Sequence, residues 1–306
     1  MSTQPVSGIA AYGISEPPRV ITPDPAQIFL RRAKRFENLA FNHPLSDWLF
    51  FLAKLTQAQH EALMQYPSVR LPDYLSLMKS HGMPPLPATS WQRDPVWRGG
   101  TLNTLLEVAE KNLPKSGLAQ LHLLNEASPA QLEAMAERVL RCDCDSELAG
   151  VLPIVAAALQ VYWTHMASAL NIDDIPAHSD TPGVCPCCGS LPVASIVRTE
   201  GPVTGLRYLH CSLCNTEWNL VRVKCAACDS TRGIAYHRIE GKRDPISAET
   251  CDSCNSYLKI AYAAQHAEVD PVADDLATLS LDFLVDEAGY QRCGPNLLLM
   301  PGSAQS

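Results

Sequence analysis

Positive charge is scarce in this sequence. The chain of 306 residues has 24 Lys and Arg against 32 Asp and Glu, which gives a net charge of −8. An acidic chain has no general attraction for nucleic acid, so a polyanionic partner would need a local basic patch. With 46% hydrophobic and 18% charged residues the balance is that of an ordinary globular protein. The length favours more than one domain.

The first twenty residues lack the features of a targeting signal. They have no basic stretch followed by an apolar core, so they do not resemble a secretory signal. Arg31 and Arg32 lie inside a helical pattern, which argues against a twin-arginine leader. We therefore expect a cytoplasmic protein. In a reducing cytoplasm, paired cysteines indicate metal binding rather than disulfides.

One long stretch contains no charged residue. Residues 148–172 (LAGVLPIVAAALQVYWTHMASALNI) have no Asp, Glu, Lys or Arg and are long enough to span a bilayer. They also contain Pro153, Gln160, Thr164 and His165 and many small Ala residues. This composition favours a centrally buried helix, so we expect no membrane insertion.

Signatures of catalysis are missing as well. No nucleophile–base motif, phosphate-binding loop or dinucleotide fingerprint stands out in the chain. We therefore predict that the protein is not an enzyme.

The first half of the chain predicts helices. Residues 1–22 contain scattered Pro and Gly and are expected to form a loosely ordered N-terminus. In residues 23–175 apolar side chains recur at helical spacing and no segment is typical of a strand, which predicts an all-helical domain. Asp24 can cap the first helix. That helix carries four basic residues that we expect on a solvated face: Arg31, Arg32, Lys34 and Arg35.

A Pro-rich connection interrupts these helices at residues 67–100. Trp91 and Trp97 flank its last part, and we expect such aromatic side chains to pin the connection onto the core. Helical patterns resume at residues 101–113 and 129–141, where Ser128 offers an N-cap.

Cysteine, in contrast, is abundant in this chain. Of twelve cysteines, eight form Cys-x-x-Cys knuckles: Cys185/Cys188, Cys211/Cys214, Cys225/Cys228 and Cys251/Cys254. Adding 40 to the numbers of the first two knuckles gives the last two. Ser190, Arg198 and Asn215 also recur as Ser230, Arg238 and Asn255, so a tandem duplication of about 40 residues is the economical interpretation.

The spacing of a knuckle suits metal binding. Two residues between thiolates allow a tight turn to aim both sulfurs at one ion, and backbone N–H groups can hydrogen-bond to those sulfurs. In the first knuckle, CPCCG, Pro186 fixes φ and Gly189 can adopt the left-handed conformation. Asn215, Asp229 and Asn255 stand at the matching positions, where Asn and Asp are well tolerated. Two tetrahedral tetrathiolate sites follow, for Zn²⁺ or iron.

Two ligand pairings are open. Tandem pairing joins the first knuckle to the second and the third to the fourth, whereas a cross-brace joins the first to the third and the second to the fourth. The repeat favours tandem pairing because each copy is then self-sufficient. Either way no ligand position is vacant, which is typical of structural rather than catalytic sites. Short β-rich segments at residues 193–197, 218–223 and 233–239 predict the hairpins of a ribbon.

The remaining candidate ligands are expected to be bystanders. His210 and His237 read as ordinary strand or turn residues, and Cys187 as a spare thiol inside the first knuckle. Cys142, Cys144 and Cys293 lie outside the knuckles, and Cys142-Asp143-Cys144 has the wrong spacing for one.

The predicted fold class is a multi-domain α+β protein. A polar linker around residues 172–183 separates the helical domain from a tandem rubredoxin-like or zinc-ribbon module at residues 181–268. Residues 269–306 form a C-terminal helix and tail, expected to pack back on the helical domain. That helix comes from the segment DDLATLSLDFLVDEAGY.

Charge weakens one functional class for the ribbon module. Residues 181–268 contain nine Lys and Arg and eight Asp and Glu, a balance of +1 before the anionic tetrathiolate sites are added. This is no basic footprint for nucleic acid. A nucleic-acid-binding zinc ribbon, a rubredoxin-like electron-transfer protein and a scaffold that recognises another protein remain as alternatives.

The order of these features resembles the FdhE-type formate dehydrogenase accessory proteins. The features are a helical first half, a CPxCG knuckle, three further knuckles with a 40-residue repeat and the closing helix, over nearly the whole chain. The resemblance implies a cytoplasmic factor that is needed to form active formate dehydrogenase and acts on its catalytic subunit. It also implies two rubredoxin-like iron sites. Their ligands would be Cys185, Cys188, Cys211, Cys214, Cys225, Cys228, Cys251 and Cys254.

Overall fold

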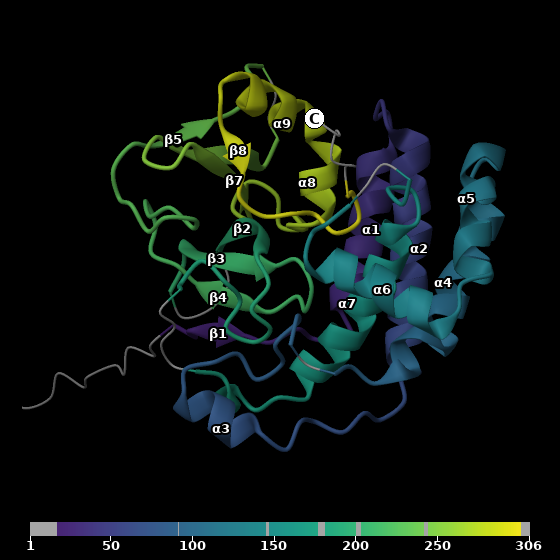
Figure 1. The fold of residues 1–306 in the computed structure, drawn as a ribbon. Helices are drawn as coiled ribbons and strands as arrows, with labels where there is room; N and C mark the ends of the chain where they lie inside the picture. The colour runs from purple at the N-terminus through teal and green to yellow at the C-terminus, as the bar shows by residue number, and fades with distance from the viewer. Residues whose placement is uncertain are drawn as a thin grey trace, which may run out of the picture.

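The computed structural model describes residues 17–90, 92–144, 147–176, 181–199, 203–241 and 244–300. Figure 1 shows a group of helices on one side and a twisted sheet on the other, with two short C-terminal helices above the sheet. Helices come first along the chain, then two cysteine-bearing ribbons, then the C-terminal helices. The predicted multi-domain α+β class is confirmed. Trp91 lies outside the described residues.

The helical side is built around one buried helix. Helix α7 (Leu152–Ser168) is the uncharged segment of the sequence, and it lies among α2, α4 and α6 with almost every side chain buried. In the part of the chain that the structure describes, no helix is both long and apolar enough to cross a membrane. The other elements here are α1 (Ile28–Ala40), α2 (Ser46–Met64), α3 (Leu75–Ser80), η1 (Pro95–Arg98), α4 (Gly100–Asn112), α5 (Lys115–Asn125), α6 (Pro129–Leu140) and η2 (Ile172–Asp174).

Local sequence signals explain several helix starts. The Ser128 hydroxyl accepts from the backbone N–H of Gln131, and the Gln131 side chain bonds back to Ser128, so α6 begins with a capping box. The Asp24 carboxylate accepts from the Ala26 N–H in the turn that leads into α1. Trp97 is fully buried and therefore pins the Pro-rich connection as expected.

The expected solvated basic face of α1 is wrong for two of its four residues. Arg31 and Lys34 are exposed, but Arg32 and Arg35 are buried. Their guanidinium groups pair with the carboxylate of Asp270, which precedes the first C-terminal helix, and with that of Asp274, which lies inside this helix. Helix α1 therefore packs against that part of the chain through buried ion pairs.

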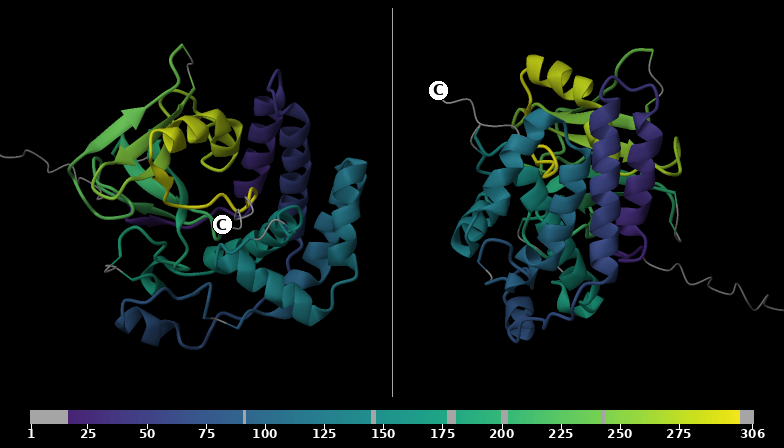
Figure 2. Two further views of the ribbon diagram at one scale, coloured as in Figure 1. Left: turned by 45° about the horizontal axis from the view of Figure 1, so that its top comes forward. Right: turned by 90° about the vertical axis from the view of Figure 1, so that its right-hand side faces the viewer.

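The strands form one sheet with two halves. Its strands are β1 (Val20–Ile21), β2 (Pro192–Arg198), β3 (Leu206–Cys211), β4 (Glu217–Asn219), β5 (Ile234–His237), β6 (Ile246–Cys251), β7 (Ser256–Tyr262) and β8 (Gln291–Arg292). The described order is β1-β4-β3-β2-β7-β6-β5, and β8 pairs with β7. The first ribbon contributes β2–β4 and the second β5–β7. Parallel pairing of β2 with β7 joins the two halves, so the ribbons are not separate units (Figure 2).

The N-terminal segment also belongs to this sheet. Residues 17–22 were expected to be loosely ordered, but Val20 is buried and pairs with Trp218 as part of β1. The Tyr208 hydroxyl donates to the Pro18 carbonyl and fixes the same segment to β3. Residues 1–16 lie outside the described part of the chain.

The C-terminal segment forms two helices instead of the one predicted. Helix α8 (Ala273–Ala277) ends at Thr278, and α9 (Leu279–Glu287) follows in a new direction. The buried ammonium of Lys259 donates to the carbonyls of Asp275 and Thr278 at the break. These carbonyls also accept the N–H groups of Thr278 and Leu281, so both carbonyl groups at the break have partners. In Figure 1, α8 lies beside α1.

Candidate metal centres

Each knuckle is a tight turn closed by the same backbone bonds. In the first, the Cys185 N–H donates to the Ser190 carbonyl, and in the third the Cys225 N–H donates to the Ser230 carbonyl, both over 2.9 Å. The residue after the second cysteine has positive φ in all four knuckles: Gly189 (77°), Asn215 (59°), Asp229 (63°) and Asn255 (51°). The left-handed positions predicted from the sequence are confirmed. They explain why Gly, Asn or Asp stands there.

The eight knuckle cysteines gather in two groups of four. Site one contains Cys185, Cys188, Cys211 and Cys214, and site two contains Cys225, Cys228, Cys251 and Cys254. Within each site all Sγ atoms lie within 4.8 Å of one another. The structure therefore brings the knuckles together in tandem, not as a cross-brace.

Both groups have the geometry that a tetrahedral ion needs. Four sulfurs at about 2.3 Å from a central ion lie about 3.8 Å from one another. In site one the Sγ atoms of Cys185 and Cys214 are 3.5 Å apart, and those of Cys188 and Cys211 are 3.4 Å apart. In site two the corresponding distances, Cys225 to Cys254 and Cys228 to Cys251, are both 3.7 Å. These four distances are shorter than the tetrahedral value by only about 0.1–0.4 Å, so a small expansion would accommodate a metal tetrathiolate.

Hydrogen bonds to the sulfurs also match a metal site. The Leu213 and Cys214 N–H groups donate to Cys211 Sγ, and the Ala227 N–H donates to Cys225 Sγ. Such bonds offset the negative charge of metal-bound thiolates. A hydroxyl lies beside the fourth sulfur of each site, Thr216 at 3.3 Å from Cys214 Sγ and Ser256 at 3.0 Å from Cys254 Sγ.

Site one is enclosed by the helical half of the chain. All four of its cysteines are buried, within the largest cluster of buried apolar side chains. The Pro-rich connection runs along the first knuckle: the Leu86 N–H donates to the Cys187 carbonyl and the Ala88 N–H to the Cys188 carbonyl. Residues 86–88 thus form a cover over the first knuckle. Trp163 of α7 holds this cover in place through a hydrogen bond from its indole N–H to the Leu86 carbonyl.

A buried polar network supports the second knuckle. The Arg32 guanidinium lies 2.9 Å from Asn215 Oδ1 and 3.2 Å from His210 Nε2, and it also pairs with Asp270. His210 Nδ1 lies 3.0 Å from Glu217 Oε1. Burial alone would raise the pKa of Glu217, but bonds with His210 and Arg198 lower it to about 2. The network ties the knuckle to α1 and to the C-terminal segment.

Site two is open on one side. Cys225 and Cys251 are buried, whereas Cys228 and Cys254 are exposed. Around Cys254, residues 252–255 are all exposed, as are residues 227–229 around Cys228. The two sites thus share a ligand arrangement and differ in their surroundings.

Burial favours the neutral thiol at two positions of site one. It raises the pKa of the Cys185 and Cys211 thiols well above the usual value. Burial would raise the pKa of Cys214 as well, but hydrogen bonds with the other thiols, Cys187 among them, lower it well below the usual value. A bound metal ion would stabilise the thiolate forms that burial disfavours.

The other candidate ligands are not in either group. His210 belongs to the buried network, and His237 Nε2 lies 3.0 Å from the Thr250 hydroxyl. Cys142, Cys144 and Cys293 lie outside both groups of four. Cys187 is more than a spare thiol, because it is buried beside Cys214 and its carbonyl receives the Leu86 N–H. Its place inside the first knuckle was the sequence signal for this role.

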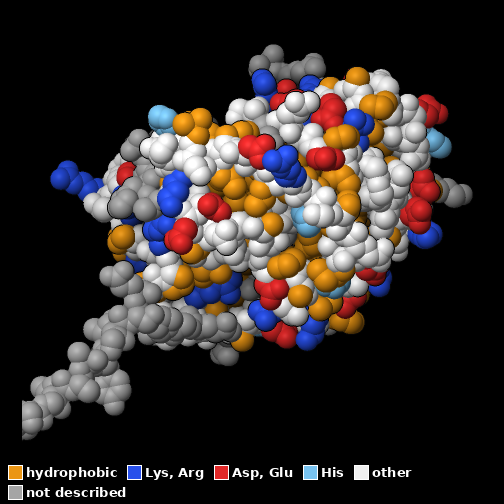
Figure 3. All heavy atoms as spheres, turned by 90° about the horizontal axis from the view of Figure 1, so that it is seen from below, with side chains coloured by type: hydrophobic (Ala, Val, Ile, Leu, Met, Phe, Trp, Pro, Cys, Tyr) orange, Lys and Arg blue, Asp and Glu red, His pale blue; other side chains and the backbone are white. Residues whose placement is uncertain are grey.

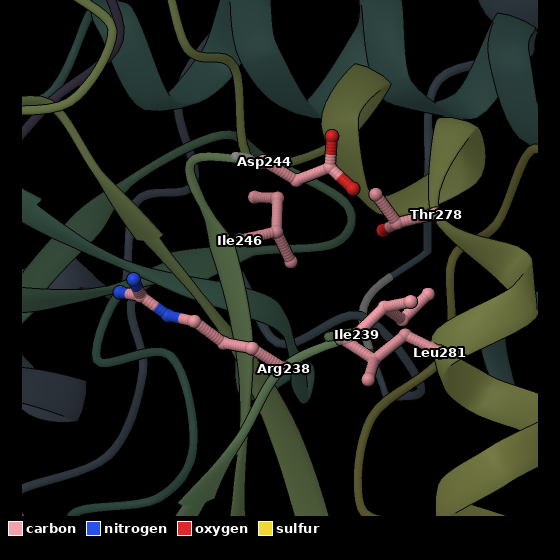
Figure 4. A pocket seen from close by; sticks show the side chains of 6 residues that line it. All are labelled: Arg238, Ile239, Asp244, Ile246, Thr278 and Leu281. Carbon is pink, nitrogen blue, oxygen red and sulfur yellow. The ribbon is translucent and has the colours of Figure 1, made fainter. Parts of the chain in front are cut away.

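The hollow behind the second ribbon is too small for a substrate. It has a volume of about 10 Å³, and Arg238, Ile246, Thr278 and Leu281 are among the residues that line it (Figure 4). That space holds about one water molecule. A larger hollow of about 470 Å³ lies at η1 and α6, on the helical side, lined by residues that include Arg93, Arg98, Glu133 and Glu137. Its charges are paired with one another.

Three family models match consecutive parts of the chain. They are FdhE, N-terminal, at residues 17–179; FdhE, central domain, at residues 184–222; and FdhE, C-terminal domain, at residues 223–299. This chain belongs to the FdhE family. The central FdhE model contains site one, and the C-terminal FdhE model contains site two together with α8 and α9.

Individual FdhE relatives agree along almost the full length. A protein FdhE homolog of Edwardsiella ictaluri is 38% identical over 284 residues, which are 92% of each chain. A protein FdhE of Salmonella newport is 36% identical over 289 residues, which are 94% of this chain and 93% of the relative. The crystal structure of the FdhE protein from Pseudomonas aeruginosa superposes with a TM-score of 0.82 at 37% identity, covering 94% of this chain and all of that one.

Proposed function

We propose that this protein is an accessory factor needed to form active formate dehydrogenase and that it binds the catalytic subunit of that enzyme. The observation that carries the proposal is membership of the FdhE family over nearly the whole chain. In its motifs the chain resembles the FdhE-type formate dehydrogenase accessory proteins. The place of action is the cytoplasm, where the catalytic subunit is made and can be met before it is complete.

The eight knuckle cysteines are the metal ligands in this proposal, one ion for each site. Iron is favoured by the family resemblance, and zinc fits the same tetrahedral sulfur geometry. Four protein ligands leave no open position for substrate or water, so each ion stabilises a shape. Tetrathiolate iron would additionally supply one-electron chemistry.

Binding rather than turnover is the activity that the surface supports. Figure 3 shows one face of the molecule, on which basic, acidic and apolar side chains are mixed. Such a mixed surface suits a protein partner better than nucleic acid. Of the hollows described above, the one beside the second ribbon has no room for a substrate, and the larger one at η1 and α6 is lined by Arg and Glu side chains that pair with one another.

Co-purification with the immature catalytic subunit of formate dehydrogenase tests this function. We expect the metal-loaded chain to retain the subunit and the variant Cys225→Ser/Cys228→Ser to retain less of it. A gel-shift assay with single- and double-stranded nucleic acid serves as the control for the alternative function. Salt-sensitive binding of nucleic acid together with no binding of the subunit would sink the proposal.

A further inference from the structure

We propose that site two exchanges its metal ion with a thiolate on another molecule, whereas site one retains its ion. The proposal rests on the proposed function only in that both sites bind metal. It concerns what the cysteines of site two do beyond holding the fold together. The acceptor is defined by its chemistry: a soft, anionic sulfur ligand that is accessible on a small thiol or on a partner protein.

Access is the first argument. An incoming ligand can form a bond to the ion only if it reaches the ion past the existing sulfurs. Cys228 and Cys254 are exposed and lie on the two knuckles of site two, so the ion would be reached between them. In site one all four cysteines are buried, and residues 86–88 run over the first knuckle. The same approach is blocked there.

Local support is the second argument. Site one is held by α7 through Trp163 and by α1 through Arg32. The turns that carry Cys228 and Cys254 hydrogen-bond to each other, since the Ser230 and Ser253 hydroxyls lie 2.9 Å apart and both bond to the Arg232 carbonyl. The fourth knuckle is also bonded to Tyr290 and Gln291 near the end of the chain. Local opening of an exposed turn costs much less than opening of a core.

Charge is the third argument. The exposed Arg222 lies in the linker that leads into the third knuckle, and the exposed Arg232 follows that knuckle. The Arg232 carbonyl contacts the Ser253 hydroxyl, which places this residue beside the fourth knuckle as well. These two basic residues offset the charge of the exposed Asp229 and Asp252 carboxylates on the same turns, which lowers the repulsion that an anionic thiol ligand meets there. Val221, which is 69% exposed, adds an apolar contact next to Arg222.

The exchange itself is a balanced ligand substitution. The acceptor thiol loses its proton and forms a metal–sulfur bond as the metal–sulfur bond to Cys254 breaks. Cys254 takes up one proton, so charge and atoms balance and no oxidant is needed. Cys254 is the leaving ligand because it is exposed and because the Ser256 hydroxyl, 3.0 Å away, can hydrogen-bond to its freed sulfur. Repetition at Cys228 would leave the ion held by the two buried cysteines and two acceptor thiolates, and the same substitution at Cys225 and Cys251 would then complete the transfer.

Cadmium NMR of the full chain loaded with two Cd²⁺ tests the proposal, with glutathione as the acceptor. We expect two tetrathiolate signals, assigned with the variant Cys225→Ser/Cys228→Ser, which should keep only the signal of site one. Glutathione should remove the signal of site two at least about tenfold faster than that of site one, and desalted protein should then contain one ion per chain. Equal rates, or earlier loss from site one, would overturn the proposal.

If the two proposed metal sites do not exist, the experiment gives a different result from a failure of the exchange alone. A chain that takes up fewer than two Cd²⁺ ions before glutathione is added would contradict the two metal sites of the proposed function, and the exchange with them.

The variant Arg222→Ala/Arg232→Ala tests the role of charge, with Lys111→Ala on α4 as the matched control. The double variant should exchange about threefold more slowly at low salt and at the wild-type rate at high salt. An unchanged exchange rate at low salt would show that the two guanidinium groups do not help the thiol ligand to reach site two.

Discussion

The two cysteine sites differ in what surrounds them far more than in how they are built. Their knuckles share a 40-residue repeat, their sulfurs are grouped in the same way, and both place a hydroxyl beside the fourth cysteine. Site one is nevertheless part of the main core, whereas two ligands of site two face solvent.

The difference comes from residues outside the repeat. The Pro-rich connection, α7 and α1 all come from the N-terminal half, and they contact the first ribbon at its metal site. A duplicated unit thus supplies two similar sites, and the surrounding chain determines how accessible each one is. The predictions that follow test this contrast, from the largest expected effect to the smallest.

Removal of a knuckle should have unequal effects at the two sites. We expect Cys185→Ser/Cys188→Ser to lose one ion and to destabilise the protein by more than about 5 kcal/mol, which is comparable to the total stability of a domain. Cys225→Ser/Cys228→Ser should lose one ion and keep the helical half folded. Metal content and thermal melts followed by circular dichroism measure both effects. Equal destabilisation by the two variants would contradict the contrast.

Arg32→Met tests the buried network behind site one. Removal of the guanidinium leaves Asp270 buried without its partner, which should cost about 3–5 kcal/mol of unfolding free energy. Arg31→Met is the matched control on the same helix, because Arg31 is exposed, and it should change stability by less than about 0.5 kcal/mol. Urea denaturation measures both variants. If the two variants are equally stable, the network has no energetic role.

Leu86→Ala tests the cover over the first knuckle. Leu86 is fully buried, so the truncation should cost about 2–5 kcal/mol and should also speed the loss of metal from site one. Leu77→Ala is the control, since Leu77 is 58% exposed on α3. The rate at which a chelator removes the first and second ions distinguishes a loosened cover from a general loss of stability. An unchanged rate at site one would show that the cover does not protect it.

Gly183→Ala tests the close contact between the ribbons. A Cβ at residue 183 would lie 1.8 Å from the carbonyl oxygen of Ala226, inside the third knuckle, so the backbone must shift. The expected cost is about 1–3 kcal/mol. Gly100→Ala, which meets no atom within 4 Å at the start of α4, should be neutral or stabilising by up to about 1 kcal/mol. Denaturant midpoints of the two variants provide the comparison.

Local patterns were the predictable part of this structure. The Cys-x-x-Cys spacing with Gly189, Asn215, Asp229 and Asn255 after the second cysteine predicted the turns, and the repeat predicted their tandem grouping. Ser128 predicted the start of α6. These features depend on residues within a few positions of one another, or on the repeat itself.

Long-range partners were the unpredictable part. Arg32 is buried because Asp270, more than two hundred residues later, supplies a carboxylate. The only local hint was its place beside Ala33 and Phe36 on the apolar stripe of α1. The cover over the first knuckle is formed by backbone groups of residues 86–88, which leave no side-chain signature. Helix α5 was missed, since Gly117 weakens its pattern.

Anomalous diffraction from a crystal of the metal-loaded protein tests the central claim most directly. Data collected at the iron and zinc absorption edges locate each ion and identify its element. The account predicts two peaks for each chain. One should lie among Cys185, Cys188, Cys211 and Cys214 and the other among Cys225, Cys228, Cys251 and Cys254. A single peak, or an ion held by cysteines from both ribbons, would contradict it.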